Sequence, residues 1–287
     1  MLKKVVIIVK ERILLQNIIC KESTLLDDLR EQGVETIIGA GGELPAEDME
    51  NTLYITDSEA EYRRLQQEGL YVLPYRHEEN AEADFTGALY VLEQIAEADY
   101  ETVDMAYRRQ AGIPWEILET RRCVIRETTV EDVEAFYQIY AERSITEYME
   151  NLFEDPEEET AYTKDYIERV YGFYGYGMWT VLEKETGQVI GRAGVSWREG
   201  FDLPELGFVI GVPWQRQGYA YEVCSAILDY AKEELGMERV QALVMEGNQR
   251  SEMLCQKLGF LESGERARLD GEMYMAWVKN LYHSDSV

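Results

Sequence analysis

The stretch IGVPWQRQGYAYEVCSAIL, residues 210–228, joins an apolar run to a helix through a tight turn. Gln215, Gly218 and Ala220 lie in that turn, and Gly218 has no Cβ. Such a turn lets backbone N–H groups point the same way, and the next helix adds its unpaired N–H groups and positive dipole end. The pattern indicates a diphosphate-binding turn, although a plain strand–turn–helix joint has the same pattern.

The charge of the chain limits the classes of partner. The 287 residues include 28 basic and 56 acidic side chains, which gives a net charge of −28. This balance argues against nucleic acid or an anionic membrane and favours a cationic acceptor. The four scattered cysteines and two histidines, His77 and His283, do not suit a zinc site or a Ser-His-Asp triad.

The N-terminal sequence MLKKVVIIVKER has only a short apolar run, Val5–Val9, before Lys10. That run is too short for a signal-peptide core or a membrane span. We therefore expect a first buried strand and a cytoplasmic, reduced protein.

Strand and helix signals alternate in the first 115 residues. Strand signals stand at 5–9, 35–38, 52–58 and 71–76, and helix signals at 25–32, 59–69 and 85–98. The alternation predicts a small Rossmann-like parallel α/β domain over residues 1–115. Gly112 and Pro114 mark its end. We expect this accessory domain to serve substrate reach or homodimerisation, with His77 in a surface loop.

The order of elements changes after residue 115. Residues 121–127 read as a strand, 128–142 and 158–177 as helices, and 178–187, 188–197 and 205–212 as three strands. A helix to Leu235, a strand at 239–246, a helix at 248–260 and a closing strand pair around 269–277 follow the glycine turn. The predicted order over 116–287 is β-α-α-β-β-β-α-β-α-β-β, a mixed α/β domain.

This order resembles the GNAT superfamily of acetyl-CoA-dependent N-acetyltransferases. The turn at 215–220 fits the family's Gln/Arg-x-x-Gly-x-Gly/Ala motif, Asn248 with Ser251 fits its Asn-x-x-Ser, and 258–260 fits its Leu-Gly-Phe. Ile125-Arg126 followed by Asp132 resembles a pattern shared by the branch of the family that acetylates protein N-terminal amines. Ribosomal-protein acetyltransferases typify this branch. That branch also contains small-amine enzymes, and the resemblance does not cover residues 1–115.

The resemblance implies where acetyl-CoA binds. Backbone groups on the fourth strand of the domain would pair with the pantetheine arm, those of Phe208, Val209 and Ile210. The turn would hold the pyrophosphate, with Gln215, Arg216, Gln217, Gly218, Tyr219, Ala220 and Tyr221. Asn248 would orient the cofactor near its thioester.

The proton-transfer groups common in the family are missing. Many members use a glutamate on the fifth strand as base and a tyrosine in the next helix as acid, and those positions hold Leu243 and Cys255. Glu205 is the candidate base, or else a surface glutamate. Ser251 is the candidate acid, or else an ordinary first-turn residue. Cys255 could protonate the thiolate, since a free thiol has a pKa of about 8.5, or else it is a buried structural cysteine.

The acceptor is expected to be a weakly basic amine. An α-amine with a pKa of about 7.7–8.0 loses its proton more readily than a lysine at about 10.4, which suits a site without an obvious strong base. Aromatic residues over 166–179 predict a rim beside the site, and the acidic run 147–159 could gather a cationic amine or be a solvated loop. The sequence thus predicts direct acetyl transfer to a primary amine, a protein N-terminus or a small amine. The alternative is a catalytically silent acyl-CoA sensor or scaffold.

Overall fold

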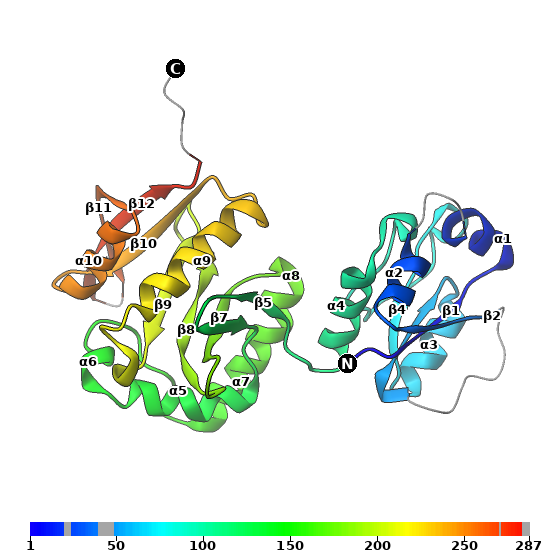
Figure 1. Cartoon of the computed structure of the whole chain (residues 1–287), viewed down its shortest axis with the longest axis horizontal. Coiled ribbons are helices and arrows are strands. Elements are labelled where there is room, and N and C mark those ends of the chain that lie inside the picture. Colours follow the sequence, from blue (N-terminus) through cyan, green and yellow to red (C-terminus); the bar gives the residue numbers. More distant parts are fainter. Residues whose placement is uncertain (20–23, 40–48, 270, 283–287) are drawn as a thin grey trace, which may run out of the picture. The chain divides into compact units, whose positions relative to one another are not determined.

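The computed structural model describes residues 1–19, 24–39, 49–269 and 271–282. The chain divides into two compact units, Met1–Trp115 and Glu116–Val287 (Figure 1). Among the described residues no helix has both the length and the apolar character that a membrane crossing requires.

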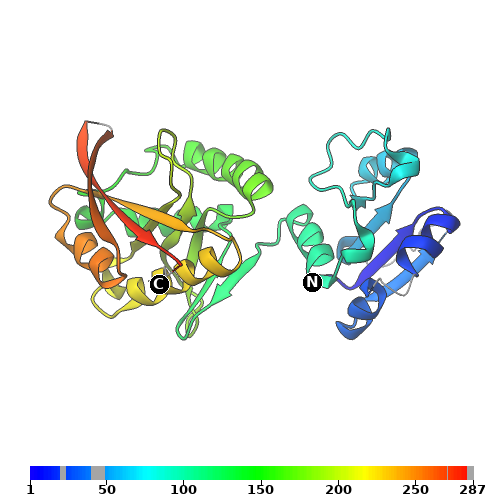
Figure 2. The same cartoon turned by 90° about the horizontal axis from the view of Figure 1, so that it is seen from above.

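The first unit is built on a four-stranded parallel sheet of order β2-β1-β3-β4 (Figures 1 and 2). The strands are β1 (Lys4–Ile8), β2 (Glu35–Gly39), β3 (Thr52–Thr56) and β4 (Tyr71–Pro74). The helices are α1 (Glu11–Ile13) with a π-helix at Leu14–Ile18, α2 (Leu25–Glu31), α3 (Glu59–Gln67) and α4 (Tyr100–Gln110). Alternate strand residues pack into two separate clusters, one with α2 and α4 and the other with α3, so the predicted parallel α/β class is confirmed.

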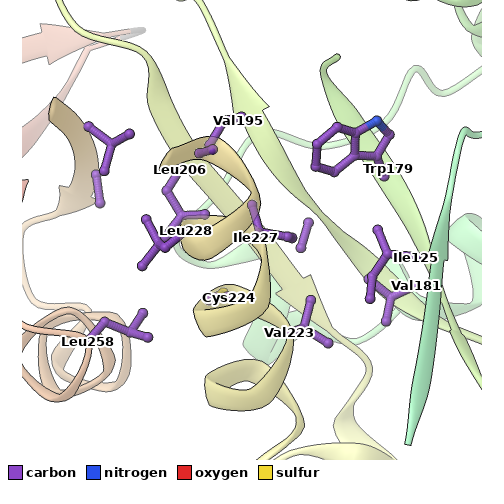
Figure 3. Close-up of a cluster of buried hydrophobic side chains, with 14 of the residues drawn as sticks. Ile125, Trp179, Val181, Val195, Leu206, Val223, Cys224, Ile227, Leu228 and Leu258 are labelled. Carbon is purple, nitrogen blue, oxygen red and sulfur yellow. The ribbon is translucent and has the colours of Figure 1, made fainter. Parts of the chain in front are cut away.

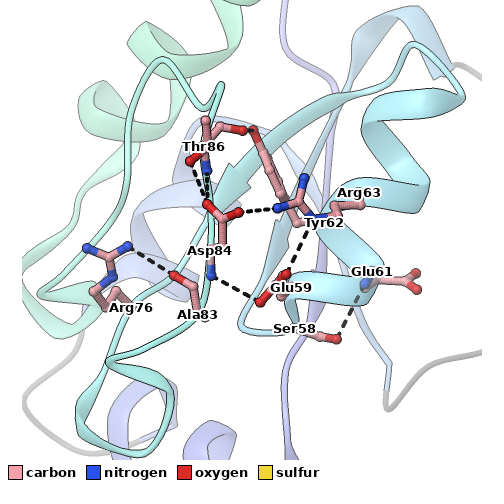
Figure 4. Close-up of polar contacts among 9 residues, drawn as sticks. All are labelled: Ser58, Glu59, Glu61, Tyr62, Arg63, Arg76, Ala83, Asp84 and Thr86. Carbon is pink, nitrogen blue, oxygen red and sulfur yellow. Dashed lines mark hydrogen bonds and ion pairs between the residues drawn. The ribbon is translucent and has the colours of Figure 1, made fainter.

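The prediction of a helix over 85–98 is wrong. This segment is largely irregular and forms one bridge, Tyr75 to Leu92, and a 3-10 turn at Ile95–Glu97. Figure 4 shows the polar contacts at its start. Asp84 accepts hydrogen bonds from the backbone and hydroxyl of Thr86 and pairs with Arg63 of α3, and Gly87 follows with a φ of +89°. Because a right-handed helix requires negative φ, the left-handed Gly87 ends any helical turn that begins at Asp84.

His77 is not a surface side chain. Its Nε2 lies 3.2 Å from the Asp57 carboxylate, and the exposed fractions of the two side chains are 6% and 3%. Its Nδ1 accepts a hydrogen bond from the Glu79 N–H, which caps a 3-10 turn. Cys20 and His283 lie outside the described residues.

The second unit contains an eight-stranded sheet of order β11-β12-β10-β9-β8-β7-β6-β5. The strands are β5 (Glu116–Glu119), β6 (Cys123–Arg126), β7 (Met178–Glu183), β8 (Val189–Ser196), β9 (Glu205–Ile210), β10 (Arg239–Met245), β11 (Leu261–Leu269) and β12 (Glu272–Asn280). Neighbouring strands are antiparallel except β9 and β10, which are parallel.

The helices of this unit follow the predicted order. They are α5 (Val133–Tyr140), α6 (Arg143–Thr146), α7 (Pro156–Tyr166) with a π-helix at Ile167–Tyr171, α8 (Gly172–Tyr174), α9 (Tyr219–Glu233) and α10 (Gln249–Lys257). The short β5 and α6 are additions to the predicted pattern.

Helix α9 is held against the sheet by one apolar face. Val223, Ile227 and Leu228, at helical spacing, pack in one cluster with strand residues that include Val181 and Leu206 (Figure 3). Full burial of each such side chain is worth about 1.5–3 kcal/mol. This packing fixes the N-terminal end of α9, and therefore the turn before it, relative to β9.

Candidate functional site

A groove opens where two parallel strands separate. β9 and β10 pair in register at a single position, Glu205 with Gln241, whereas β9 pairs with β8 along its whole length. A cavity of about 1660 Å³ lies at this opening. Its walls include Leu206–Ile210 of β9, Ala242–Met245 of β10 and the turn before α9.

The separation leaves one edge of β9 available to a ligand. Phe208, Val209 and Ile210 all line the groove, and past Glu205 no ladder position joins β9 to β10 in the described sheet. Strand backbone groups without a ladder partner can bond an extended ligand as an added strand would. These are the three residues to which the family resemblance assigns the pantetheine arm.

The turn before α9 has the backbone conformation of an anion-binding site. Arg216 has a φ of +60°, and Gly218, the N-cap of α9, has a φ of +87°. The N–H groups of residues 219–221 precede the first intrahelical bond, which Glu222 donates to the Gly218 carbonyl. Left-handed residues alternating with extended or helical ones form concave sets of N–H donors, and the helix adds its positive end.

The side chains of the turn mainly stabilise its backbone conformation. The Gln215 Nε2 donates to the Ile210 carbonyl at 2.8 Å, and the Gln217 Nε2 donates to the Pro213 carbonyl at 2.6 Å. The Tyr219 hydroxyl donates to Glu183 at 2.6 Å. Of the predicted turn residues, Gln217 is the one that does not line the groove, while Gln215, Arg216, Gly218, Tyr219, Ala220 and Tyr221 do.

Three basic side chains line the groove together with this turn. They belong to Arg216, Arg250 and Lys257. The Lys257 Nζ lies 4.1 Å from the centre of the Tyr221 ring, and an Arg250 Nη lies 3.5 Å from the Gln215 side-chain oxygen. A chain of net charge −28 thus has a local basic surface next to its N–H donors.

Asn248 and Ser251 lie at the start of α10, and both line the groove. The Asn248 side-chain oxygen caps the helix by accepting the Ser251 N–H at 3.2 Å. The oxygen of Asn248 therefore has a structural role, and its amide nitrogen is left as a donor for a ligand.

Glu205 lines the groove at the point where the strands separate. Its carboxylate accepts a hydrogen bond from Arg198 Nε at 2.8 Å, and the same guanidinium reaches Glu150 at 3.1 Å. Burial raises the pKa of Glu205 above its ordinary value, and the Arg198 charge offsets part of that rise. A carboxyl group with a raised pKa is better matched to proton transfer near neutral pH.

Cys255 does not fit its predicted role as a proton donor. The side chain is completely buried in the core of the second unit and is not part of the groove wall. Burial raises the pKa of this thiol to about 12, so it neither contacts a ligand in the groove nor ionises readily. Leu243 does line the groove and brings no proton-transfer group there.

The aromatic rim is only partly formed by the residues that the sequence predicts. Tyr171 and Trp179 are fully buried core residues, whereas Tyr166, Tyr174 and Tyr176 line the groove. The Trp197 Nε1 donates to the Tyr176 hydroxyl at 2.7 Å.

Sequence reasoning missed several lining residues, including Tyr140, Arg192, Trp197 and Arg198. Their positions depend on strand pairing and on the packing of α5, and no local motif marks them. The acidic run contributes Glu147, Glu150 and Glu159 to the wall.

Comparison with known proteins identifies a family that matches the second unit and proteins that are similar to the chain. Residues 122–261 match the acetyltransferase (GNAT) domain family. The chain is 29% identical over 151 residues to a Bacillus subtilis (strain 168) protein named uncharacterized N-acetyltransferase YoaA, covering 52% of this chain and 84% of that protein. It is 35% identical over 94 residues to the [ribosomal protein uS5]-alanine N-acetyltransferase of Escherichia coli (strain K12), covering 32% and 46% of the two chains.

A solved structure shares the fold. The ribosomal-protein-S5-alanine acetyltransferase from Vibrio fischeri superimposes with a TM-score of 0.50 at 16% identity, covering 58% of this chain and 97% of that one.

Proposed function

We propose that this protein transfers the acetyl group of acetyl-CoA directly to a primary amine, because residues 122–261 match the acetyltransferase (GNAT) domain family. The observation that carries the proposal is one continuous groove that joins the unpaired edge of β9 to the N–H donors at the start of α9. The activity is assigned to the 116–287 unit. The 1–115 unit is an accessory domain for substrate reach or homodimerisation.

When bound, acetyl-CoA supplies an activated acetyl thioester. The backbone N–H groups from Arg216 to Tyr221 bind its diphosphate, and Arg216, Arg250 and Lys257 neutralise the phosphate charge. Backbone groups of Phe208–Ile210 bind the pantetheine arm, and the Asn248 amide orients the thioester end. Glu222, also in the first turn of α9, is already paired with Arg122 and does not oppose the diphosphate.

Glu205 takes the proton from the acceptor amine, directly or through a water molecule. The neutral nitrogen then attacks the carbonyl carbon, the C–N bond forms and the C–S bond breaks. Ser251 would donate a proton to the leaving thiolate, and the acylated nitrogen would release its second proton to solvent, from which Ser251 regains one. Arg198 keeps the Glu205 carboxylate in place but must leave it room to accept the proton.

The acceptor is an α-amine or another weakly basic amine. Away from the turn, five glutamates and two arginines line the groove, and this net negative charge attracts a cationic amine before it is deprotonated. The [ribosomal protein uS5]-alanine N-acetyltransferase, whose name specifies a protein-alanine acceptor, supports an N-terminal α-amine.

The test is thiol release from acetyl-CoA with two matched peptides. One has a free N-terminal alanine, and the other has a blocked N-terminus and one lysine side chain. We expect faster release with the first peptide at pH 7.5, and a Ser251→Ala enzyme should lose turnover while it still binds acetyl-CoA. Absence of release with every amine, despite acetyl-CoA binding, would contradict the proposed transfer.

A further inference from the structure

Arg122 lies far from the glycine turn in sequence but contacts it in the structure. It stands between β5 and β6, and its Nη1 donates to the Gln217 carbonyl at 3.1 Å. Its guanidinium carbon lies 3.9 Å from the centre of the Tyr219 ring. Arg122 is absent from the groove wall, so it contacts the turn from the side away from the groove.

The hydrogen bond to Gln217 sets the direction of one peptide plane. In a trans peptide the C=O and the following N–H point in opposite directions, and the described chain has no cis peptide. The Gln217 carbonyl points to Arg122, so the Gly218 N–H points away from Arg122, toward the groove that Gly218 lines. Arg122 thus fixes the orientation of a donor at the centre of the turn.

The guanidinium is itself held in one orientation. Its Nε donates to Glu222 at 2.7 Å, and the Arg122 N–H and the Thr120 hydroxyl each donate to the same carboxylate at 2.8 Å. Burial acts to raise the pKa of Glu222, but these hydrogen bonds outweigh it and lower that pKa. The carboxylate therefore stays charged, and Arg122 cancels a negative charge that would otherwise lie in the first turn of α9, where an anion is to bind.

We propose that Arg122 is a positioning residue for the diphosphate of the acyl donor. It acts through the Gln217–Gly218 peptide and not by contact with the ligand. This inference rests on the proposed function, because it assigns the diphosphate of coenzyme A to the turn. It predicts that loss of Arg122 weakens the binding of only those acyl donors that carry a diphosphate.

The test compares two donors in the full-length Arg122→Met enzyme. Acetyl-CoA carries the diphosphate, and S-acetylpantetheine has the same thioester and arm without it. We expect KM for acetyl-CoA to rise about tenfold with kcat unchanged, which corresponds to ~1.4 kcal/mol. KM for S-acetylpantetheine should stay within twofold of wild type. A general loss of structure would impair both donors.

Lys184→Met is the matched control. Lys184 pairs with Glu119 of β5 at 2.6 Å, and its N–H donates to the Arg122 carbonyl. This variant loosens the same hairpin without touching the turn, and acetyl-CoA KM should not change. Arg122→Lys keeps the charge but not the fork that spans Gln217 and Glu222, so it should resemble Arg122→Met.

The outcomes distinguish a failure of the proposed function from a failure of the role assigned to Arg122. Wild-type protein that fails to bind acetyl-CoA in calorimetry overturns the proposed function together with this inference. Wild-type protein that binds acetyl-CoA, with Arg122→Met or Arg122→Lys unchanged or with both donors impaired equally, overturns the role of Arg122 alone.

Discussion

Asp132→Asn should remove a large part of the stability of the second unit. The Asp132 side chain is buried, and its carboxylate accepts two hydrogen bonds from the Arg126 guanidinium at 2.7 Å each. It also accepts the Thr129 N–H at 2.9 Å and the Thr180 hydroxyl at 2.8 Å. The pair ties the end of β6 to the start of α5, at one side of the sheet that carries the groove.

The expected cost follows from the environment of Arg126. An asparagine at 132 replaces one acceptor oxygen by an NH2 group, which faces a donor, and leaves the guanidinium without its counter-charge. The Arg126 side chain is only 16% exposed. Removal of one partner of a buried pair costs about 3–5 kcal/mol, whereas a whole domain is stable by about 5–15 kcal/mol.

The assay is urea unfolding followed by tryptophan fluorescence. Four of the five tryptophans lie in the second unit, so the signal mainly reports this unit. Asp165→Asn is the matched control, because Asp165 pairs with Arg169 at the same 2.7 Å but is 53% exposed. We expect the control substitution to lower the free energy of unfolding by less than about 0.5 kcal/mol. Equal losses in the two variants would refute the reasoning.

Acid should abolish the difference in the free energy of unfolding between wild type and Asp132→Asn. Burial acts to raise the pKa of Asp132, but the hydrogen bonds from Arg126 and Thr129 outweigh it and lower that pKa below its ordinary value. A carboxyl group whose folded pKa is lowered stabilises the fold above its unfolded pKa, about 3.9, and loses that contribution as pH falls through the folded value. A gap that persists undiminished at pH 2 would contradict this assignment.

Three further variants test the chemistry of the groove. Glu205→Gln should lower kcat by about 10²–10⁴-fold, the usual worth of a general base, with calorimetric acetyl-CoA affinity unchanged; retained kcat would exclude Glu205 as the base. Arg198→Met removes the charge that offsets the burial of Glu205, so the pKa of Glu205 rises and the acid limb of the kcat/KM profile should move to higher pH; an unmoved limb would count against it. Cys255→Ala should leave turnover within twofold and cost on the order of 1 kcal/mol in urea unfolding; lost turnover in a folded variant would restore a role for the buried thiol.

The fold could be predicted from the sequence because its signals are local. Apolar periodicity, the Gly218 turn and the helix caps place the strands and helices of the second unit in order. The same local reasoning failed over 85–98, where the residues have helical spacing. The left-handed backbone of Gly87 interrupts that segment, and its start is tied through Asp84 to Arg63 of α3.

The contacts within the site depend on distant parts of the chain. Arg198 reaches Glu205 only because β8 and β9 pair. Arg122 reaches Gln217 only because the turn between β5 and β6 lies beside the start of α9. The burial of Cys255 follows from the side of α10 that packs on the core. A single sequence shows which residue types are present but not which of them these pairings bring together.

Calorimetric titration with acetyl-CoA, for wild type and Gly218→Glu, tests the central claim most directly. Gly236→Glu is the matched control, because Gly236 also has a positive φ, +63°, but does not line the groove. Both substitutions strain the backbone by about 1–2 kcal/mol, and only the first adds a side chain to the turn, where its Cβ would lie 3.6 Å from Arg122 Nη2 and disturb the backbone that carries the N–H donors. We predict binding by wild type and Gly236→Glu and none by Gly218→Glu. Acetyl-CoA affinity that survives in folded Gly218→Glu, or is absent from wild type, would contradict the assignment of this turn to the cofactor.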